Sequence, residues 1–308
     1  MAELNNPGCI LVLGANTGIP GCDFAPDKFV GAILLDKSTI IADADIPSII
    51  TKLQELTLAT GRNRIHPIFR FEEIADNSEE ETVAALGYGS KQVVKEGKYD
   101  WSFRIVKGGM CLNNKLRAFN KASKKVLFVD SNNVIYGTKV EGGITGFTMD
   151  FFYAKPFKAN DASNAAIFNI RFALAKPEEF NEKVAFVKAD QDVEESVKGL
   201  IDLELVQLAV AAGKVTVGIR TACDKVDIYE ALGDALAAGE LWKVTKDGAP
   251  VAVTSVATND DAGGWDVSFV GTGEHVITLV SASELATANV GGYPENGYEA
   301  GILKSTLP

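Results

Sequence analysis

The sequence predicts a mainly β (α+β) protein: a β-sandwich or barrel-like domain with one or two packed helices, followed by a small immunoglobulin-like β-sandwich. Three observations predict this fold class. Short segments rich in Val, Ile, Phe and Tyr follow one another across turn residues and do not alternate with helices. One segment, 45–61, combines an apolar helical stripe with helix signals at both ends. The segment KADQDVEESVKG, 188–199, is charged and contains no aromatic residue, which is typical of a domain boundary.

Most of the N-terminal domain, residues 1–190, is expected to form strands. The sequence SNN at 131–133 is typical of a hairpin turn between two of them, and EGK at 96–98 is expected to join another pair. The stretch GTKVEGGITG, 137–146, is expected to be poor in regular structure. The predicted strands are 28–36, 64–74, 91–96, 99–106, 124–130, 133–140, 146–154 and 166–174.

The helix predicted over 45–61 has Asp45 as its N-cap, Pro47 in its first turn and Gly61 as its C-cap. Its isoleucine and leucine residues form a broad apolar stripe, which should pack against a sheet. Two weaker helices are predicted over 111–123 and 226–239.

A linker, 191–199, is expected to lead into a C-terminal domain, 200–308. About seven short strands separated by turn signals are typical of an immunoglobulin-like sandwich, and other small sandwiches fit the same pattern. The predicted strands are 200–210, 214–220, 240–246, 250–257, 265–270, 275–281 and 299–305.

The stretch CILVLGANTGIPG, 9–21, has the glycine-rich character of a dinucleotide-binding turn. Such a site also needs a helix whose N-terminus faces the phosphates. Pro20 and Pro26 each lack an amide donor, and no crossover helix precedes the strand at 28–36. We therefore expect no cofactor, and an extended N-terminal arm or first strand instead. Its candidate contacts to a neighbouring subunit are Ile10, Leu11, Val12 and Leu13.

Catalytic and metal-binding patterns are weak elsewhere too. The two histidines, His66 and His275, lie in strand-like surroundings and are expected to be structural. The four cysteines lack C-x-x-C spacing and are expected to be free thiols, with a Cys9–Cys22 bridge as the alternative. No apolar run approaches the roughly 20 residues of a membrane-spanning helix. These patterns favour a structural or binding protein that is not an enzyme and needs no metal or membrane.

Charge is unevenly distributed within a net charge of −11. The segment 91–125 has ten basic and two acidic residues, whereas 190–299 has nineteen acidic and six basic residues. The basic segment is either a solvated surface or a contact to an acidic surface or nucleic acid. Its candidate contact residues are Lys91, Lys95, Lys98, Arg104, Lys107, Arg117 and Lys121.

The strands around DIPSIITKLQELTLATG, the hairpin KKVLFVDSNNVIYGTK and a sandwich beginning near GKVTVGIRT together resemble the major tail tube or a related virion structural protein of a tailed bacteriophage. The resemblance is one of architecture and implies no functional residues. It implies a homo-oligomeric ring or tube with an outward-facing C-terminal domain, assembled in the host bacterial cytoplasm and carried in the virion with other virion proteins. DNA would pass through without sequence-specific binding. Because a DNA-passing channel is expected to be acidic or neutral, 91–125 would meet an acidic neighbour.

Two other functions remain open. A capsid decoration or host-surface binding protein would use the loop GGYPENGYEAG, 291–301, with Tyr293 and Tyr298 facing the partner. A nucleotide-dependent oxidoreductase would require the N-terminal glycines to hold a cofactor, and Pro20 and Pro26 argue against it.

Overall fold

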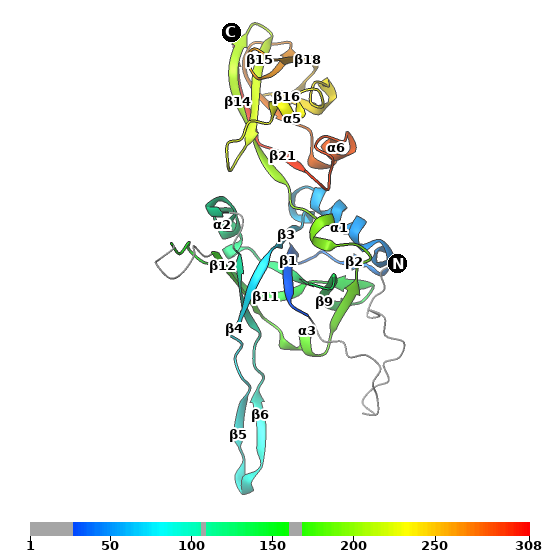
Figure 1. Cartoon of the computed structure of the whole chain (residues 1–308), viewed down its shortest axis with the longest axis vertical. Helices are drawn as coiled ribbons and strands as arrows, with labels where there is room; N and C mark the ends of the chain where they lie inside the picture. Colours follow the sequence, from blue (N-terminus) through cyan, green and yellow to red (C-terminus); the bar gives the residue numbers. More distant parts are fainter. Residues whose placement is uncertain (1–26, 106–108, 160–167) are drawn as a thin grey trace. The chain divides into compact units, whose positions relative to one another are not determined.

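The computed structural model describes residues 27–105, 109–159 and 168–308, and its secondary structure is mainly β, as predicted (Figure 1). The described chain divides into two compact units. The first comprises 27–56 and 62–197, and the second comprises 57–61 and 198–308. The division falls at the end of the segment 191–199, although that segment holds the short helix α4 (Val193–Ser196) and is not a simple linker.

The first unit is built from short strands and a few helices. Its helices are α1 (Ile49–Leu58), α2 (Gly109–Arg117), α3 (Pro177–Asn181) and α4, with 3-10 turns η1 (Asp43–Ser48), η2 (Gly61–Asn63), η3 (Gly87–Gly89) and η4 (Ala118–Lys121). Its strands are β1 (Phe29–Asp36), β2 (Ile41–Ala42), β3 (His66–Phe69), β4 (Phe71–Asp76), β5 (Thr82–Ala85), β6 (Lys91–Lys95), β7 (Asp100–Ile105), β8 (Lys124–Asp130), β9 (Val134–Val140), β10 (Gly143–Thr145), β11 (Phe147–Ala154), β12 (Phe168–Leu174) and β13 (Val184–Lys188).

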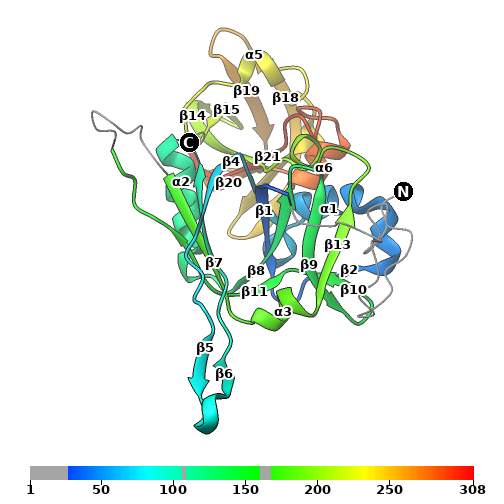
Figure 2. The ribbon, with the colours of Figure 1, turned by 60° about the horizontal axis from the view of Figure 1, so that its bottom comes forward.

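Eleven of these strands form one curved sheet, in the order β2-β10-β9-β8-β11-β12-β7-β4, with β1 on β8, β3 on β1 and β13 on β9. Strand β1 lies inside this sheet, and its side chains enter two different cores. Ala32 and Leu34 join an aromatic-rich core with β7, β11 and β12, whereas Ile33 and Leu35 join a core with α1 and α4. Burial on both faces explains why the sequence FVGAILLD is almost continuously apolar. Figure 2 shows α1 beside this sheet.

The helix predicted over 45–61 is shorter than expected. Residues Asp43–Ser48 form the 3-10 turn η1, and α1 begins at Ile49 and ends at Leu58. Asp45 is not its N-cap, and its carboxylate lies 3.6 Å from Lys52 Nζ instead. Gly61 has the left-handed φ of 63° expected of a residue that ends a helix, but it lies in η2. The apolar stripe was predicted correctly, since Ile49, Ile50 and Leu53 are all buried.

The predicted turn at 131–133 joins β8 and β9, and Asp130 holds it together. The Asp130 carboxylate accepts hydrogen bonds from the backbone N–H of Asn132 and Val134, each at 2.9 Å, and from the Tyr136 hydroxyl at 2.8 Å. Burial and the hydrogen bond to this carboxylate raise the pKa of Tyr136. Asn133 adopts φ 61°, which asparagine tolerates better than most residues. A buried carboxylate thus satisfies turn amide groups that have no partner in the strand ladder.

The second unit is a β-sandwich of a five-stranded sheet, β18-β19-β15-β14-β21, and a four-stranded sheet, β17-β16-β20-β22. Most strands predicted over 200–308 were correct to within a few residues. The elements are β14 (Ile201–Ala211), β15 (Lys214–Thr221), α5 (Tyr229–Leu232), η5 (Gly239–Leu241), β16 (Trp242–Lys246), β17 (Ala249–Val251), β18 (Val253–Asn259), β19 (Gly264–Phe269), β20 (Gly273–Leu279), α6 (Ala282–Thr287), β21 (Tyr298–Ala300) and β22 (Leu303–Leu307).

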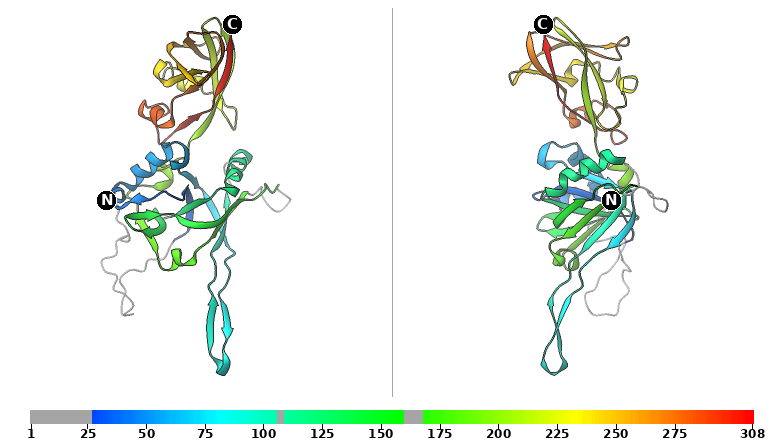
Figure 3. Two further views of the ribbon diagram at one scale, coloured as in Figure 1. Left: turned by 180° about the vertical axis from the view of Figure 1, so that it is seen from behind. Right: turned by 90° about the vertical axis from the view of Figure 1, so that its left-hand side faces the viewer.

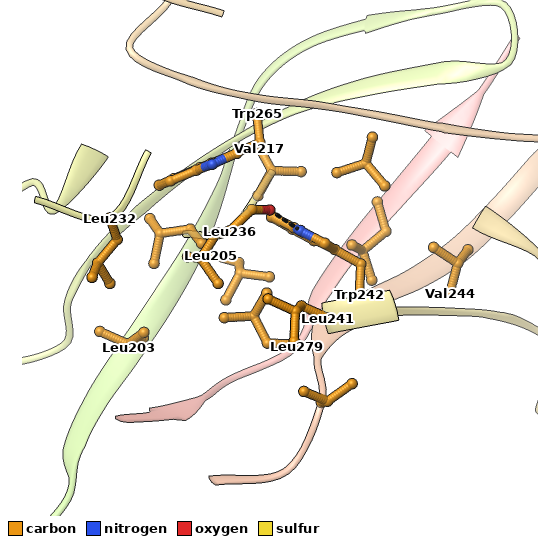
Figure 4. Packing of buried hydrophobic residues seen from close by; sticks show 14 of the residues in the cluster. Leu203, Leu205, Val217, Leu232, Leu236, Leu241, Trp242, Val244, Trp265 and Leu279 are labelled. Atoms are coloured by element: carbon orange, nitrogen blue, oxygen red, sulfur yellow. Dashed lines mark hydrogen bonds between the residues drawn. The ribbon is translucent and has the colours of Figure 1, made fainter. Parts of the chain in front are cut away.

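Two tryptophans lie in the core between these sheets (Figure 4). Trp265 is fully buried, and its indole N–H donates to Gly233 O at 2.8 Å. The Trp242 indole N–H donates to Leu236 O at 2.8 Å. Both carbonyls belong to the segment around α5, so the tryptophans bury large apolar rings and also fix this short helix against the sandwich.

Three local expectations were wrong. The stretch 137–146 is an ordered hairpin, in which β9 and β10 pair around Gly142 at φ 80°. The residues EGK at 96–98 do not form a hairpin turn, because β6 pairs with β5 and β7 pairs with β4 and β12. Both cysteines within the described residues, Cys111 and Cys223, are disulfide-bonded and are not free thiols.

Because Cys111 and Cys223 are oxidised, a thiol reagent should detect no more than two of the four cysteines in the denatured, unreduced chain. After reduction and removal of the reductant, the same titration should detect all four. Detection of four thiols before reduction would contradict the oxidised state of these two cysteines.

Candidate functional site

Strands β11, β12, β7 and β4 form a continuous antiparallel ladder at one end of the large sheet. Paired residues form rows across the four strands. One such row consists of Tyr153, Arg171, Ser102 and Ala75. One face of the ladder is buried in the aromatic core, with Phe103, Phe152 and Phe172 pointing inward.

The two outer edges of this ladder are covered to different extents, and neither is fully paired with another strand. Among the described strands, β4 is the last of the sheet and pairs only with β7. On the opposite side, β11 pairs with β8 only through Phe147 and Thr148, and no strand among the described residues covers 149–153. At Ala154 the side chain of Asn120 satisfies both backbone groups, since it accepts from the N–H at 2.7 Å and donates to the C=O at 3.3 Å. Unpaired N–H and C=O groups on such edges are templates for another strand.

The second face of the ladder carries charged pairs beside exposed aromatic rings. Arg171 binds the Asp100 carboxylate through two nitrogens, with Nε at 2.6 Å, and its guanidinium lies 5.3 Å from the centre of the Phe151 ring. The hydrogen bond to Asp100 raises the pKa of Arg171. Arg104 contacts Glu73 at 3.1 Å and Lys98 contacts Asp150 at 3.7 Å. Because these cations are paired within the chain, this face has little excess positive charge to hold DNA phosphates.

Between β4 and β7 the chain makes a long excursion, residues 77–98, which we call the arm. Figure 3 shows it from two sides as a narrow two-stranded ribbon, β5 and β6, extending from the ends of β4 and β7. Its root continues the ladder, since Asn77 N–H donates to Asp100 O at 2.7 Å and Glu79 N–H to Lys98 O at 2.9 Å. All residues of β6 and three of the four in β5 are exposed. Strand β6 was predicted from the sequence, whereas its partner β5 was not.

The predicted basic contact residues are distributed over several elements. Lys91 and Lys95 lie on the arm, and Lys95 Nζ is 2.9 Å from the Glu79 carboxylate, which lowers the pKa of Glu79. Lys98, at the root of the arm, and Arg104, in β7, are ion-paired as described above, Arg117 lies at the end of α2, and Lys121 lies in η4. Lys107 and the apolar residues Ile10, Leu11, Val12 and Leu13 lie outside the described residues.

The loop 291–297 does not present both predicted tyrosines to a partner. Tyr298 is only 8 % exposed and belongs to the core of the second unit, because it begins β21 beside β14. Tyr293 is partly buried, which raises its pKa, and its hydroxyl donates to Lys198 O at 3.4 Å. A partner would meet the exposed polar residues Glu295 and Asn296 at this loop.

Among the described residues, neither histidine is paired with the carboxylate or hydroxyl that would accompany a catalytic base. His275 is fully buried, and one ring nitrogen lies 2.9 Å from Gly273 O. His66 stacks on Phe119 at 4.7 Å between ring centres, and burial, reinforced by Lys124 and Arg64, lowers its pKa to about 4. No group of three or more His, Cys, Asp or Glu in the described part of the chain is arranged to hold a metal ion. Among the same residues, no helix is long and apolar enough to span a membrane.

The buried His66 predicts a pH dependence of stability. Its folded pKa of about 4 lies below the ordinary value of 6.5, so the unfolded chain binds the proton more tightly. The contribution of His66 to the free energy of unfolding should therefore fall by about 1–3 kcal/mol as the pH drops from 6.5 towards 4. Well above pH 6.5 this contribution should not change with pH. Denaturant titrations of wild type and His66→Gln at several pH values measure the difference. Parallel curves for the two proteins would contradict the assignment.

No protein-family model matches this chain, and no curated protein sequence matches it.

Proposed function

We propose that this protein is a non-enzymatic structural subunit that assembles with copies of itself into a ring or tube, as in the tail tube of a tailed bacteriophage. The observation that carries the proposal is the ladder β11-β12-β7-β4, with a free edge at β4 and a partly free edge at β11. A sheet with two free, non-identical edges supports head-to-tail association, which closes into a ring or continues as a helix.

Strand direction is compatible with this association. Successive strands of the ladder alternate in direction, so β4 and β11 run opposite ways. When β4 of one copy lies beside β11 of the next, the contact is antiparallel and the alternation continues from copy to copy. The sheet that continues across this contact then has the aromatic core on one face and the ion-paired charges on the other. A wall with paired charges would let DNA pass without sequence-specific binding.

In this proposal the β-sandwich of the second unit is an outward-facing, acidic module of immunoglobulin-like type that takes no part in closing the ring. The whole particle would be assembled in the bacterial cytoplasm and carried in the virion. A capsid-associated role uses the same self-association and differs in the partner proteins.

Negative-stain electron microscopy of the purified chain, across a concentration series, tests the proposal, together with light scattering after size-exclusion chromatography. Rings or tubes of uniform diameter are expected as the concentration rises. A chain that stays monomeric at every concentration would overturn the proposed function.

A further inference from the structure

The arm has two faces, and each carries exposed apolar side chains. Val83 pairs with Val93, Ala84 with Gln92 and Ala85 with Lys91. Because side chains alternate along a strand, neighbouring pairs point to opposite sides of the ribbon. The first face carries Val83, Val93, Ala85 and Lys91, and the second face carries Ala84, Gln92 and Leu86.

Neither face is covered by the rest of the described chain. Val83 and Val93 are 45 % and 52 % exposed on the first face, and Leu86 is 48 % exposed on the second. At the tip, Tyr88 is fully exposed between two glycines and adopts φ 65°. The nine residues 82–90 contain no charge. Contiguous exposed apolar side chains of this kind mark a protein contact, and an isolated two-stranded ribbon is marginal in water.

The root of the arm indicates which protein covers it. The arm continues β4 and β7, and β4 is the ladder edge that meets the next copy in the proposed assembly. The ten residues 77–86 allow it to reach roughly 30 Å beyond β4. Charges at the root are partly neutralised within the arm, since Lys95 pairs with Glu79. The arm therefore begins at the proposed subunit junction, where other copies of this chain are the nearest partners.

Resting on the proposed function, we propose that the arm inserts between two other copies of this chain, so that a different copy covers each face. One flat partner can contact only one side of a two-stranded ribbon, because the two sets of side chains point in opposite directions. Two apolar faces therefore require two covering surfaces. Each copy in the assembly would in this way bind two others through the arm, in addition to its neighbour along the sheet edge.

Site-specific photo-cross-linking tests this arrangement. A benzophenone amino acid replaces Val83 in one variant and Leu86 in another, and each is assembled with isotope-labelled wild-type chains before irradiation and peptide mapping. We expect both positions to cross-link to labelled copies, at two different regions of the chain. Assemblies in which both positions label one region, or in which one position gives no intermolecular product, would overturn the two-copy insertion while leaving the proposed function intact. If the wild-type chain never assembles, both proposals fail.

Charge substitutions give an independent measurement. Val83→Glu and Leu86→Glu each place a carboxylate on one exposed face, so the melting temperature of the monomer should stay unchanged. Each should raise the concentration needed for assembly by at least tenfold. Glu80→Gln, at the root of the arm, is the matched control and should assemble like wild type. An effect from only one of the two faces would contradict insertion between two copies.

Discussion

One of the two variants Ile74→Pro and Ala75→Pro is expected to lose ring or tube formation completely while its melting temperature stays close to that of wild type. Backbone N–H groups of consecutive strand residues point to opposite sides, so one of these two faces β7 and the other faces the free edge of β4. Proline removes an N–H, and it is tolerated in an edge strand when that N–H faces outward. The variant that loses the outward N–H therefore loses only a hydrogen bond to the next copy.

The partner variant is the internal control. It loses a hydrogen bond to β7 and should lower the free energy of unfolding by about 1–3 kcal/mol, in the range of a proline placed against a ladder. Thermal unfolding, followed by circular dichroism, separates the two variants before electron microscopy is done. If the thermally stable variant forms normal rings, β4 is not an assembly edge and the head-to-tail proposal is wrong.

Local patterns in the sequence were sufficient for most of the strands. β8 was predicted at its observed bounds, because apolar β-formers run up to Asp130 and the turn SNN follows directly. β1 was also predicted from apolar β-forming residues, which here form a continuous run because both faces of the strand are buried. Strands whose bounds are set by residues close in the sequence can therefore be predicted from the sequence.

Features that depend on distant residues were missed. Strand β5 contains Val83 as its only large apolar residue, and it exists because Glu79 to Ala85 lies opposite Lys91 to Lys98 once β4 and β7 have paired. The segment 64–74 looks like a single strand, yet Arg70 adopts φ 68° and divides it into β3 and β4. Arg70 is held there by Glu194, which lies 124 residues away in α4. No local pattern contains such a partner.

The candidate site belongs to the same category. The free edges of β4 and β11 follow from the order of strands in the sheet, in which sequence neighbours β10 and β11 are separated by β9 and β8. Strand order is set by packing of the whole unit, and the pattern of apolar residues along the sequence does not reveal it. The basic segment 91–125 illustrates the converse: it is conspicuous in the sequence, but several of its cations are paired with carboxylates from other parts of the chain.

Trp265→Ala is expected to destabilise the second unit strongly while leaving self-assembly intact. The indole is fully buried, lies 5.1 Å from the Tyr229 ring and 6.2 Å from the Trp242 ring between centres, and donates to Gly233 O. Its removal should cost about 3–5 kcal/mol, a large share of the stability of a domain of this size. Val270→Ser, at a side chain 77 % exposed in the same unit, is the matched control and should change stability by less than about 0.5 kcal/mol.

Calorimetry of the Trp265 variant should show an early transition from the second unit, and electron microscopy below that temperature should still show rings, because the ladder edges lie in the first unit. The distinction decides the role of the second unit. If rings disappear as soon as its sandwich melts, the second unit helps to close the assembly and is not an outward-facing module. If rings persist after it melts, self-association is a property of the first unit, and the acidic sandwich is free to meet other partners.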